Sequence, residues 1–212
     1  MTDFLYPFIE ADERDPAPLL ADLERSATAK ADASRRLGVA TLAGCAPEIG
    51  RAAAAMAERF AAGGRLLAFG NGGSAADAAG LVALFGTPPW GRPLPALSLG
   101  ADPVVLSALG NDVGFEVVFA RQLMAHGRPG DLVVGLSTSG NSANLLAAFA
   151  EARRRGMLSV GVAGYGGGRM ATASLDHCLV VKADSVHRIQ ETQSALLFAL
   201  WSAVQSGLDG RP

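Results

Sequence analysis

Charge and sulfur are both scarce in this chain of 212 residues, and each scarcity excludes a class of protein. Only 18% of the residues are charged and the net charge at pH 7 is −2. This composition argues against a surface that binds nucleic acid, because such surfaces are strongly basic. The two cysteines, Cys45 and Cys178, lie far apart and form neither a CxxC motif nor a zinc-ligand spacing with histidine. We therefore expect reduced, buried thiols and no disulfide framework.

The sequence contains no long hydrophobic run, and its first residues do not have the pattern of a secretory leader. The longest apolar stretch, residues 195–204, contains one serine and is too short to span a bilayer. The first residues, MTDFLYPFIEADERD, carry neither the basic segment nor the long apolar core of a signal peptide. We therefore expect a cytoplasmic protein without a membrane segment.

Apolar sequence is abundant, and it is arranged in alternating short and long segments. Half of the residues are hydrophobic, and short apolar runs between punctuating residues are typical of strands buried on both faces. These runs cover residues 65–69, 94–99, 132–136, 158–163 and 178–181. Helical patterns cover residues 74–85, 115–124, 141–156 and 185–206. The alternation predicts an α/β fold with a doubly wound parallel sheet.

An N-terminal helical extension precedes the predicted sheet. One helical pattern begins at Leu19, and a second covers residues 49–62 and ends at two glycines. We expect an arm at residues 1–18, a single domain at residues 19–208 that includes these helices, and a tail at residues 209–212. The arm carries apolar residues beside acidic ones, so it either folds back onto the protein or docks another protein.

Two turns rich in small residues and hydroxyls each follow a predicted strand and open a predicted helix. The first is Gly70-Asn71-Gly72-Gly73-Ser74, and the second, STSGNS, runs from Ser137 to Ser142. Backbone N–H groups at a helix N-terminus point outward, and the helix dipole favours an anion there. Both turns fall at the carboxyl ends of strands, where ligands bind in such sheets. The pair predicts one phosphate-bearing ligand held from two sides.

Two other interpretations of these turns are weaker. The first turn satisfies a dinucleotide fingerprint, but the acidic residue after the second predicted strand, Asp102, comes too late in the sequence. A helix N-cap needs one polar residue, whereas the second turn offers the hydroxyls of Ser137, Thr138, Ser139 and Ser142. Its glycine, Gly140, also permits close approach of the backbone. Phosphate binding is therefore favoured over nucleotide binding and over capping alone.

The segments FGNGGSAAD, LGNDVGF, GLSTSGNSANLL and HRIQE resemble motifs of the phosphoheptose isomerase branch of the sugar isomerase (SIS) family. The resemblance runs from about Leu20 to Ser206, and it extends to relatives that regulate a replication initiator. It implies a five-stranded parallel sheet and a homotetramer whose active sites are completed across subunit interfaces. The implied reaction converts sedoheptulose 7-phosphate to an aldoheptose phosphate.

The resemblance also implies which residues contact the substrate and its phosphate. The matching positions are Asn71, Gly72, Gly73, Ser74, Asn111, Asp112, Ser137, Thr138, Ser139, Ser142 and Gln190. In the family, the glutamine that Gln190 matches contacts substrate and often a zinc ion. Simpler roles stay open for three of them: Asn71 stabilising a turn, Asp112 capping the next helix, and Gln190 facing solvent. Asp77 and Asp102 are further candidates for contacts with sugar hydroxyls.

Three family positions that carry zinc or acid–base chemistry are replaced. A histidine and a glutamate four residues apart, and a second histidine eight residues after the glutamine, are here Gly80, Leu84 and Phe198. Imidazole and carboxylate groups are the usual zinc ligands and proton-transfer groups. We therefore expect neither a zinc cofactor nor the family's usual chemistry.

Two functions remain, and they belong to different classes. The protein binds a sugar phosphate without isomerising it, as a sensor, adaptor or assembly factor, or it isomerises the sugar with a different acid–base pair. His187 and Glu191, which flank Gln190 on one predicted helix, are the candidates for that pair. His126 and His177 are interpreted as structural. A purely structural oligomer is disfavoured, because it would not need the second turn.

Overall fold

The computed structural model describes residues 17–210, and the chain divides into two compact units after Arg36. Residues 1–16 of the predicted arm and the last two residues of the predicted tail lie outside the described residues. The described part of the first unit is helical and belongs to α1 (Ala17–Ala61), which continues into the second unit. The domain boundaries at residues 18 and 208 stay predictions.

A single helix, α1, stands where the sequence predicted two. The predicted break before residue 49 is wrong, because α1 continues through Gly38, Gly44 and Pro47. The two glycines keep ordinary right-handed backbone angles, and the alanines around them favour helix. A proline inside a helix removes one backbone hydrogen bond, but Pro47 does not end α1.

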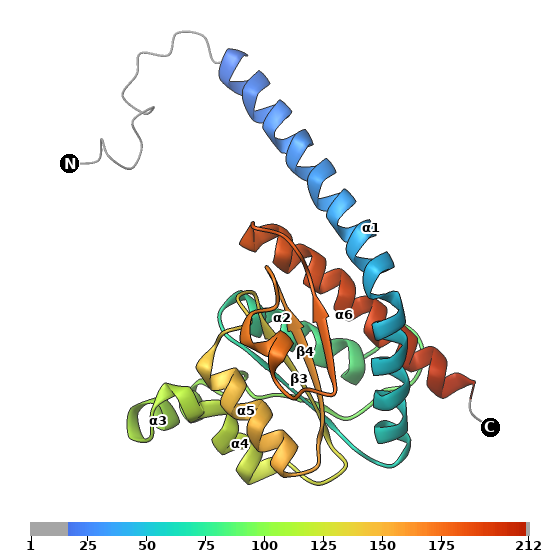
Figure 1. Cartoon of the computed structure of the whole chain (residues 1–212), viewed down its shortest axis with the longest axis vertical. Helices are drawn as coiled ribbons and strands as arrows, with labels where there is room; N and C mark the ends of the chain where they lie inside the picture. The colour runs from blue at the N-terminus through green and yellow to red at the C-terminus, as the bar shows by residue number, and fades with distance from the viewer. Residues whose placement is uncertain (1–16, 211–212) are drawn as a thin grey trace. The chain divides into compact units, whose positions relative to one another are not determined.

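A five-stranded parallel sheet forms the centre of the second unit and confirms the predicted doubly wound α/β fold (Figure 1). The strands are β1 (Leu66–Gly70), β2 (Ala96–Ser98), β3 (Leu132–Ser137), β4 (Leu158–Ala163) and β5 (His177–Val180). Their order is β2-β1-β3-β4-β5, and Leu67 of β1 lies between Leu97 and Val133. The three central strands are fully buried, whereas the two edge strands are only partly buried.

Helices cover both faces of the sheet (Figure 1). On one face, α2 (Gly73–Gly86), α6 (Val186–Asp209) and the second half of α1 share one apolar core, which includes the fully buried Trp201. On the other face, α4 (Val118–His126) and α5 (Ala143–Arg154) build a second core around Phe69, which lies between Phe119 and Phe149.

The stretch between β2 and β3 holds more helix than the sequence predicted. It contains α3 (Pro103–Asp112), which sequence reasoning missed, and a short 3₁₀ turn η1 (Phe115–Val117) directly before α4. Asp102 caps α3, since its Oδ1 accepts from the N–H groups of Val104 and Val105 at 2.9 and 3.2 Å. A proline at the first position then suits the helix start.

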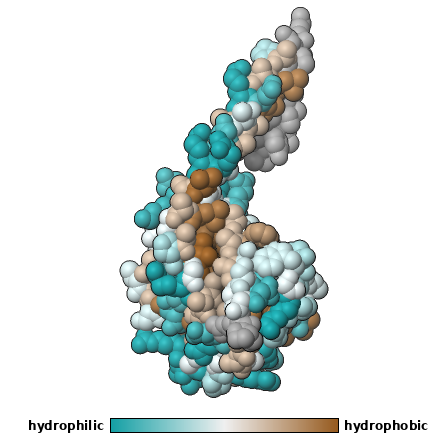
Figure 2. Space-filling view, turned by 90° about the vertical axis from the view of Figure 1, so that its right-hand side faces the viewer, coloured by the Kyte–Doolittle hydropathy of each residue, from teal (hydrophilic) through white to brown (hydrophobic). Residues whose placement is uncertain are grey.

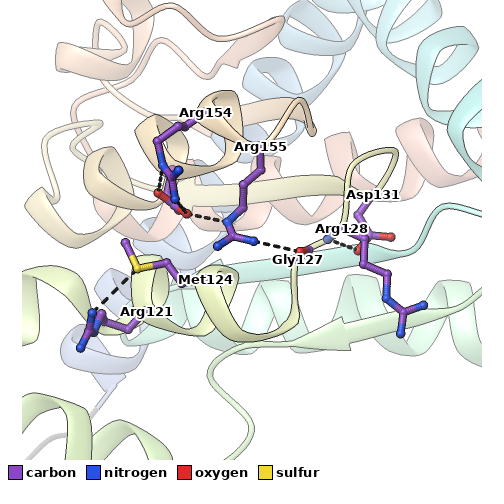
Figure 3. Close-up of polar contacts among 8 residues, drawn as sticks. Arg121, Met124, Gly127, Arg128, Asp131, Arg154 and Arg155 are labelled. Carbon is purple, nitrogen blue, oxygen red and sulfur yellow. Dashed lines mark hydrogen bonds and ion pairs between the residues drawn. The ribbon is translucent and has the colours of Figure 1, made fainter.

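Hydrogen bonds and an ion pair of charged residues connect segments near the amino ends of the strands. The Asp131 carboxylate is almost fully buried and accepts from Arg65 Nη2 at 2.7 Å and from the Arg128 N–H at 3.0 Å. Nearby, Arg155, the C-cap residue of α5, donates to the Gly127 carbonyl, as Figure 3 shows. These bonds lie at the edge of the sheet opposite the two turns, so they serve the fold.

Both cysteines are free, but Cys45 and Cys178 are half-buried rather than buried as expected. Burial raises the pKa of the Cys178 thiol to about 11.

Some large apolar side chains are exposed, and Figure 2 shows a face on which brown, hydrophobic residues gather beside teal, hydrophilic ones. Within residues 17–210, none of the helices combines the length and hydrophobicity that crossing a membrane requires.

Candidate functional site

The first turn connects β1 to α2, and its glycines are required by close contacts. A Cβ on Gly70 would lie 2.5 Å from the Ser74 carbonyl oxygen, and a Cβ on Gly73 would lie 2.1 Å from Gln190 Nε2. Gly72 has a φ of 55°, which favours glycine. Gln190, on the first turns of α6, therefore packs directly against the first turn and does not simply face solvent.

The second turn connects β3 to α5 and gathers hydroxyl groups. Ser137 Oγ lies 3.0 Å from Ser142 Oγ and 3.4 Å from Ser139 Oγ, and it accepts from the Gly140 N–H at 3.1 Å. Ser142 occupies the N-cap position of α5 but makes no side-chain cap bond. Capping therefore does not account for its hydroxyl, which is held instead by Ser137. Thr138 is half-buried in the same turn.

A reciprocal amide pair joins the two turns. Asn71 Nδ2 donates to Asn144 Oδ1 at 3.0 Å, and Asn144 Nδ2 donates to Asn71 Oδ1 at 2.9 Å. Asn71 directly follows β1, and the buried Asn144 lies in the first turn of α5, which follows β3. The amide pair therefore connects the segments that follow two neighbouring strands. The strand order reverses between β1 and β3, and such a switch point opens a crevice for ligands. Sequence reasoning missed Asn144, although an asparagine in the first turn of a buried helix face is a usable signal.

A third loop, after β4, closes against the second turn. The Arg169 N–H donates to Asn141 Oδ1 at 2.9 Å, and a Cβ on Gly140 would lie 2.0 Å from the Gly167 carbonyl oxygen. In the same loop Tyr165 has a φ of 50°, a strained conformation for this residue type. From the sequence, Gly164 was expected at the carboxyl edge of the sheet, because it follows the fourth predicted strand. The glycine run GYGGG was the signal for the rest of the loop.

Other predicted site residues make no hydrogen bond or ion pair to the two turns within residues 17–210. Asn111 and Asp112 end α3, are exposed, and bond to each other at 2.8 Å. Asp112 does not cap the next helical turn, whose N-cap is Gly114. His187 and Glu191 are both exposed on α6, and neither side chain makes a hydrogen bond or ion pair within residues 17–210.

The remaining two histidines have contacts that serve the fold. His126 ends α4, and its carbonyl accepts from Arg65 Nη2 at 2.7 Å. His177 begins β5, and its Nδ1 lies 2.7 Å from Glu48 Oε1 of α1. The ring contact of His177 agrees with the structural interpretation, whereas the contact of His126 is made by its backbone and does not test the role of its side chain.

A cavity of about 270 Å³ lies between α2 and α6, one helical turn beyond the contact of Gly73 with Gln190. Its lining is mostly apolar and consists of Ala76, Asp77, Gly80, Leu81, Leu84, Ser194 and Leu197. Ser194 Oγ donates to Asp77 Oδ1 at 2.9 Å, while Asp77 Oδ2 is buried without a hydrogen-bond partner. Burial raises the pKa of the Asp77 carboxyl above its usual value, and the bond from Ser194 offsets part of this effect.

Phe198 follows this cavity on α6 and is 49% exposed, with its ring 5.2 Å from that of Trp201. The Trp90 ring centroid lies 4.8 Å from that of Trp201, and Trp90 is 41% exposed. Across residues 17–210, no three His, Cys, Asp or Glu side chains are grouped in a way that could hold a metal ion.

Comparison with known proteins finds a matching family model, related sequences and related structures. A family model described as "SIS domain" matches residues 31–164. The phosphoheptose isomerase of Rhodospirillum rubrum is 45% identical over 169 residues, which cover 79% of this chain and 89% of the relative. That of Akkermansia muciniphila is 45% identical over 166 residues, covering 76% and 87%. The structure of phosphoheptose isomerase GmhA from Neisseria gonorrhoeae matches with a TM-score of 0.81 and 36% identity, covering 87% of this chain and 99% of the other.

Proposed function

The chain belongs to the phosphoheptose isomerase branch of the SIS domain family, and on that premise we propose that it binds a sugar phosphate without isomerising it. The ligand is sedoheptulose 7-phosphate or a similar sugar phosphate. The bound state then serves a sensing, adaptor or assembly role.

The binding proposal rests on one observation. The hydrogen bonds between Asn71 and Asn144 connect two polar turns at the switch point of the sheet. The phosphate would lie at the N-terminus of α5, where the hydroxyls of Ser137, Ser139 and Ser142 converge. Hydroxyl donors and the positive end of the helix dipole both stabilise a dianion. The sugar would then extend toward Asn71, Gly73 and Gln190, whose amide groups match its hydroxyls.

The proposal of binding without isomerisation rests on the cavity between α2 and α6. Moving a proton between adjacent sugar carbons needs a base within hydrogen-bond reach of the reacting atoms. Gly80 and Leu84 supply none there, and Phe198 lies half-exposed against Trp201. The one carboxylate in the lining, Asp77, accepts from Ser194 through Oδ1, and its Oδ2 is buried away from solvent. His187 and Glu191 are exposed, and neither side chain makes a hydrogen bond or ion pair within the described residues.

The same residues do not fit the family's zinc ion. A zinc site needs three or four nitrogen, sulfur or carboxylate ligands, and the cavity offers one carboxylate, Asp77, and one hydroxyl, Ser194, among apolar side chains. This lining is therefore unsuited to holding a zinc ion.

Association into a homotetramer is part of the proposal. The exposed rings of Trp90 and Phe198 support it, since both lie on one aromatic cluster with Trp201. Exposed aromatic clusters of this kind mark protein interfaces.

Thermal denaturation with added sugar phosphates tests the proposal. Sedoheptulose 7-phosphate should raise the Tm, and the double variant Ser137→Ala/Ser139→Ala should lose that rise. Ser107→Ala/Ser206→Ala, which alters two exposed helix serines, is the matched control and should keep it. The absence of a Tm rise across a panel of sugar phosphates would refute binding. Solvent deuterium appearing at C1 or C2 of a bound ketose phosphate would refute the non-isomerising role.

A further inference from the structure

We propose that a second cavity, between α1 and β5, binds a small monocarboxylate with a short apolar tail. This cavity contains no residue of the two turns and shares no lining residue with the cavity between α2 and α6. The inference therefore goes beyond the proposed sugar-phosphate binding and does not depend on it.

Two contacts hold the second half of α1 against β5, and the cavity lies beside them. His177 Nδ1 lies 2.7 Å from Glu48 Oε1, and Cys45 Sγ lies 3.9 Å from the Val180 carbonyl oxygen. From the first contact to the second, the chain runs backward along α1 and forward along β5. The cavity continues this line beyond the second contact, along residues 37–44 of α1 and toward Lys182, which follows β5.

The size and the walls of this cavity suit a small molecule with an apolar part. Its volume is about 290 Å³, close to the lower end of the range of about 300–1,000 Å³ that is typical of small-molecule sites. Leu37, Ala40 and Val180 supply apolar wall. A methylene group that leaves water for such a wall favours binding without a hydrogen-bond partner. A ligand with a short alkyl chain therefore gains affinity here.

Two polar groups of the lining have no partner in the part of the chain that the structure describes. Thr41 is 9% exposed, and its hydroxyl makes no hydrogen bond to another described residue. The Lys182 ammonium makes neither a hydrogen bond nor an ion pair among these residues. A hydroxyl buried without a partner is costly, and an ammonium group can only donate. Both groups therefore favour a ligand that accepts hydrogen bonds.

Charge complementarity points to a carboxylate as that acceptor. Lys182 is the one charged residue of the lining. Glu48, one turn further along α1, is paired with His177 and Arg51, so its own charge is already balanced. One ammonium group balances a monoanion but not a phosphate dianion, and the apolar walls offer few partners to sugar hydroxyls. The lining therefore matches one carboxylate group on an apolar tail.

An NMR titration of the full-length chain with hexanoate, 1-hexanol and acetate separates the head group from the tail. The parent protein should bind hexanoate more tightly than the other two, because only hexanoate has both parts. Lys182→Met keeps the apolar stem of the side chain and removes its charge. This variant should bind hexanoate about 3- to 5-fold more weakly, as expected for an ion pair of an exposed ammonium, and should bind 1-hexanol as the parent does. Lys30→Met, at an exposed position of α1 outside the cavity, is the matched control and should behave like the parent.

A second variant fills the cavity. Gly44 lines it from α1, and a Cβ there would meet no atom within 4 Å, so Gly44→Leu fits the fold and replaces a residue of low helix propensity. This variant should lose the binding of both hexanoate and 1-hexanol. Gly50→Leu, at another open position of α1 outside the cavity, is its control and should keep both.

Three results would overturn the inference. Unchanged affinity of Gly44→Leu for hexanoate would show that the ligand binds elsewhere. Equal affinity of the parent for hexanoate and 1-hexanol would refute recognition of the carboxylate. Failure of the parent to bind hexanoate would refute the site itself.

Discussion

Replacing Asn144 by alanine should destabilise the protein by about 2 kcal/mol, because the substitution removes both hydrogen bonds that join the two turns. Each bond between the Asn71 and Asn144 amides, at 3.0 and 2.9 Å, is worth about 1 kcal/mol net. Asn144 is only 3% exposed, so water does not replace it. For a chain of this size, a loss of about 2 kcal/mol lowers the Tm by about 4–8 °C.

A double-mutant cycle separates the pair from other effects of the substitution. Urea denaturation of Asn71→Ala, Asn144→Ala and the double variant should give a coupling energy of about 1–2 kcal/mol, since the second substitution then removes bonds already lost. Asn111→Ala, which alters an exposed amide at the end of α3, is the control and should cost about 0.5 kcal/mol or less. A coupling energy near zero would refute the idea that this pair locks the two turns together.

Two further predictions concern the fold around the site and at the opposite edge of the sheet. Gly140→Ala should cost at least about 2 kcal/mol in urea denaturation, because Gly140 has a φ of 66° and its new Cβ would lie 2.0 Å from a backbone oxygen. Gly166→Ala, which has open space, is the control, and equal midpoints for the two variants would contradict the expected clash. Burial opposes ionisation of Asp131, but hydrogen bonds from Arg65 and the Arg128 N–H outweigh it and hold its pKa below the usual 3.8. The stability that Asp131 contributes is therefore complete above that value and is lost as the pH falls through the lower folded pKa. Asp131→Asn should flatten this acid-side loss in denaturation curves recorded at falling pH, and an unchanged slope would count against the role of the carboxylate.

Local patterns predicted the sheet well and the helices less well. The runs at residues 132–136 and 158–163 match β3 and β4 closely, because central strands must be apolar on both faces. The single α1 was not predicted, since Gly38, Gly44 and Pro47 look like breaks when they are judged one at a time. The helix α3 was not predicted. It begins directly after Asp102, whose carboxylate accepts hydrogen bonds from the N–H groups of its first turn.

The candidate site, like the fold, was only partly predictable from the sequence. The two turns are visible in the sequence because a strand end, small residues and hydroxyls lie next to one another in the chain. Asn144, the glycine loop after β4 and the contact of Gln190 with Gly73 depend on strand order, which brings residues far apart in the chain to one edge. Neither the orphaned Asp77 Oδ2 nor the exposure of His187 can be deduced from residue type.

The sequence by itself determined the fold class, the family motifs and the place of the two polar turns, because these depend on local periodicity and on residues that are adjacent in the chain. Only the tertiary structure decided that the turns are bound to each other through Asn71 and Asn144, and that Asp77 faces Ser194 beside an apolar cavity. These contacts join separate strands and helices, and their geometry is set by how the sheet orders its strands and how α2 packs on α6.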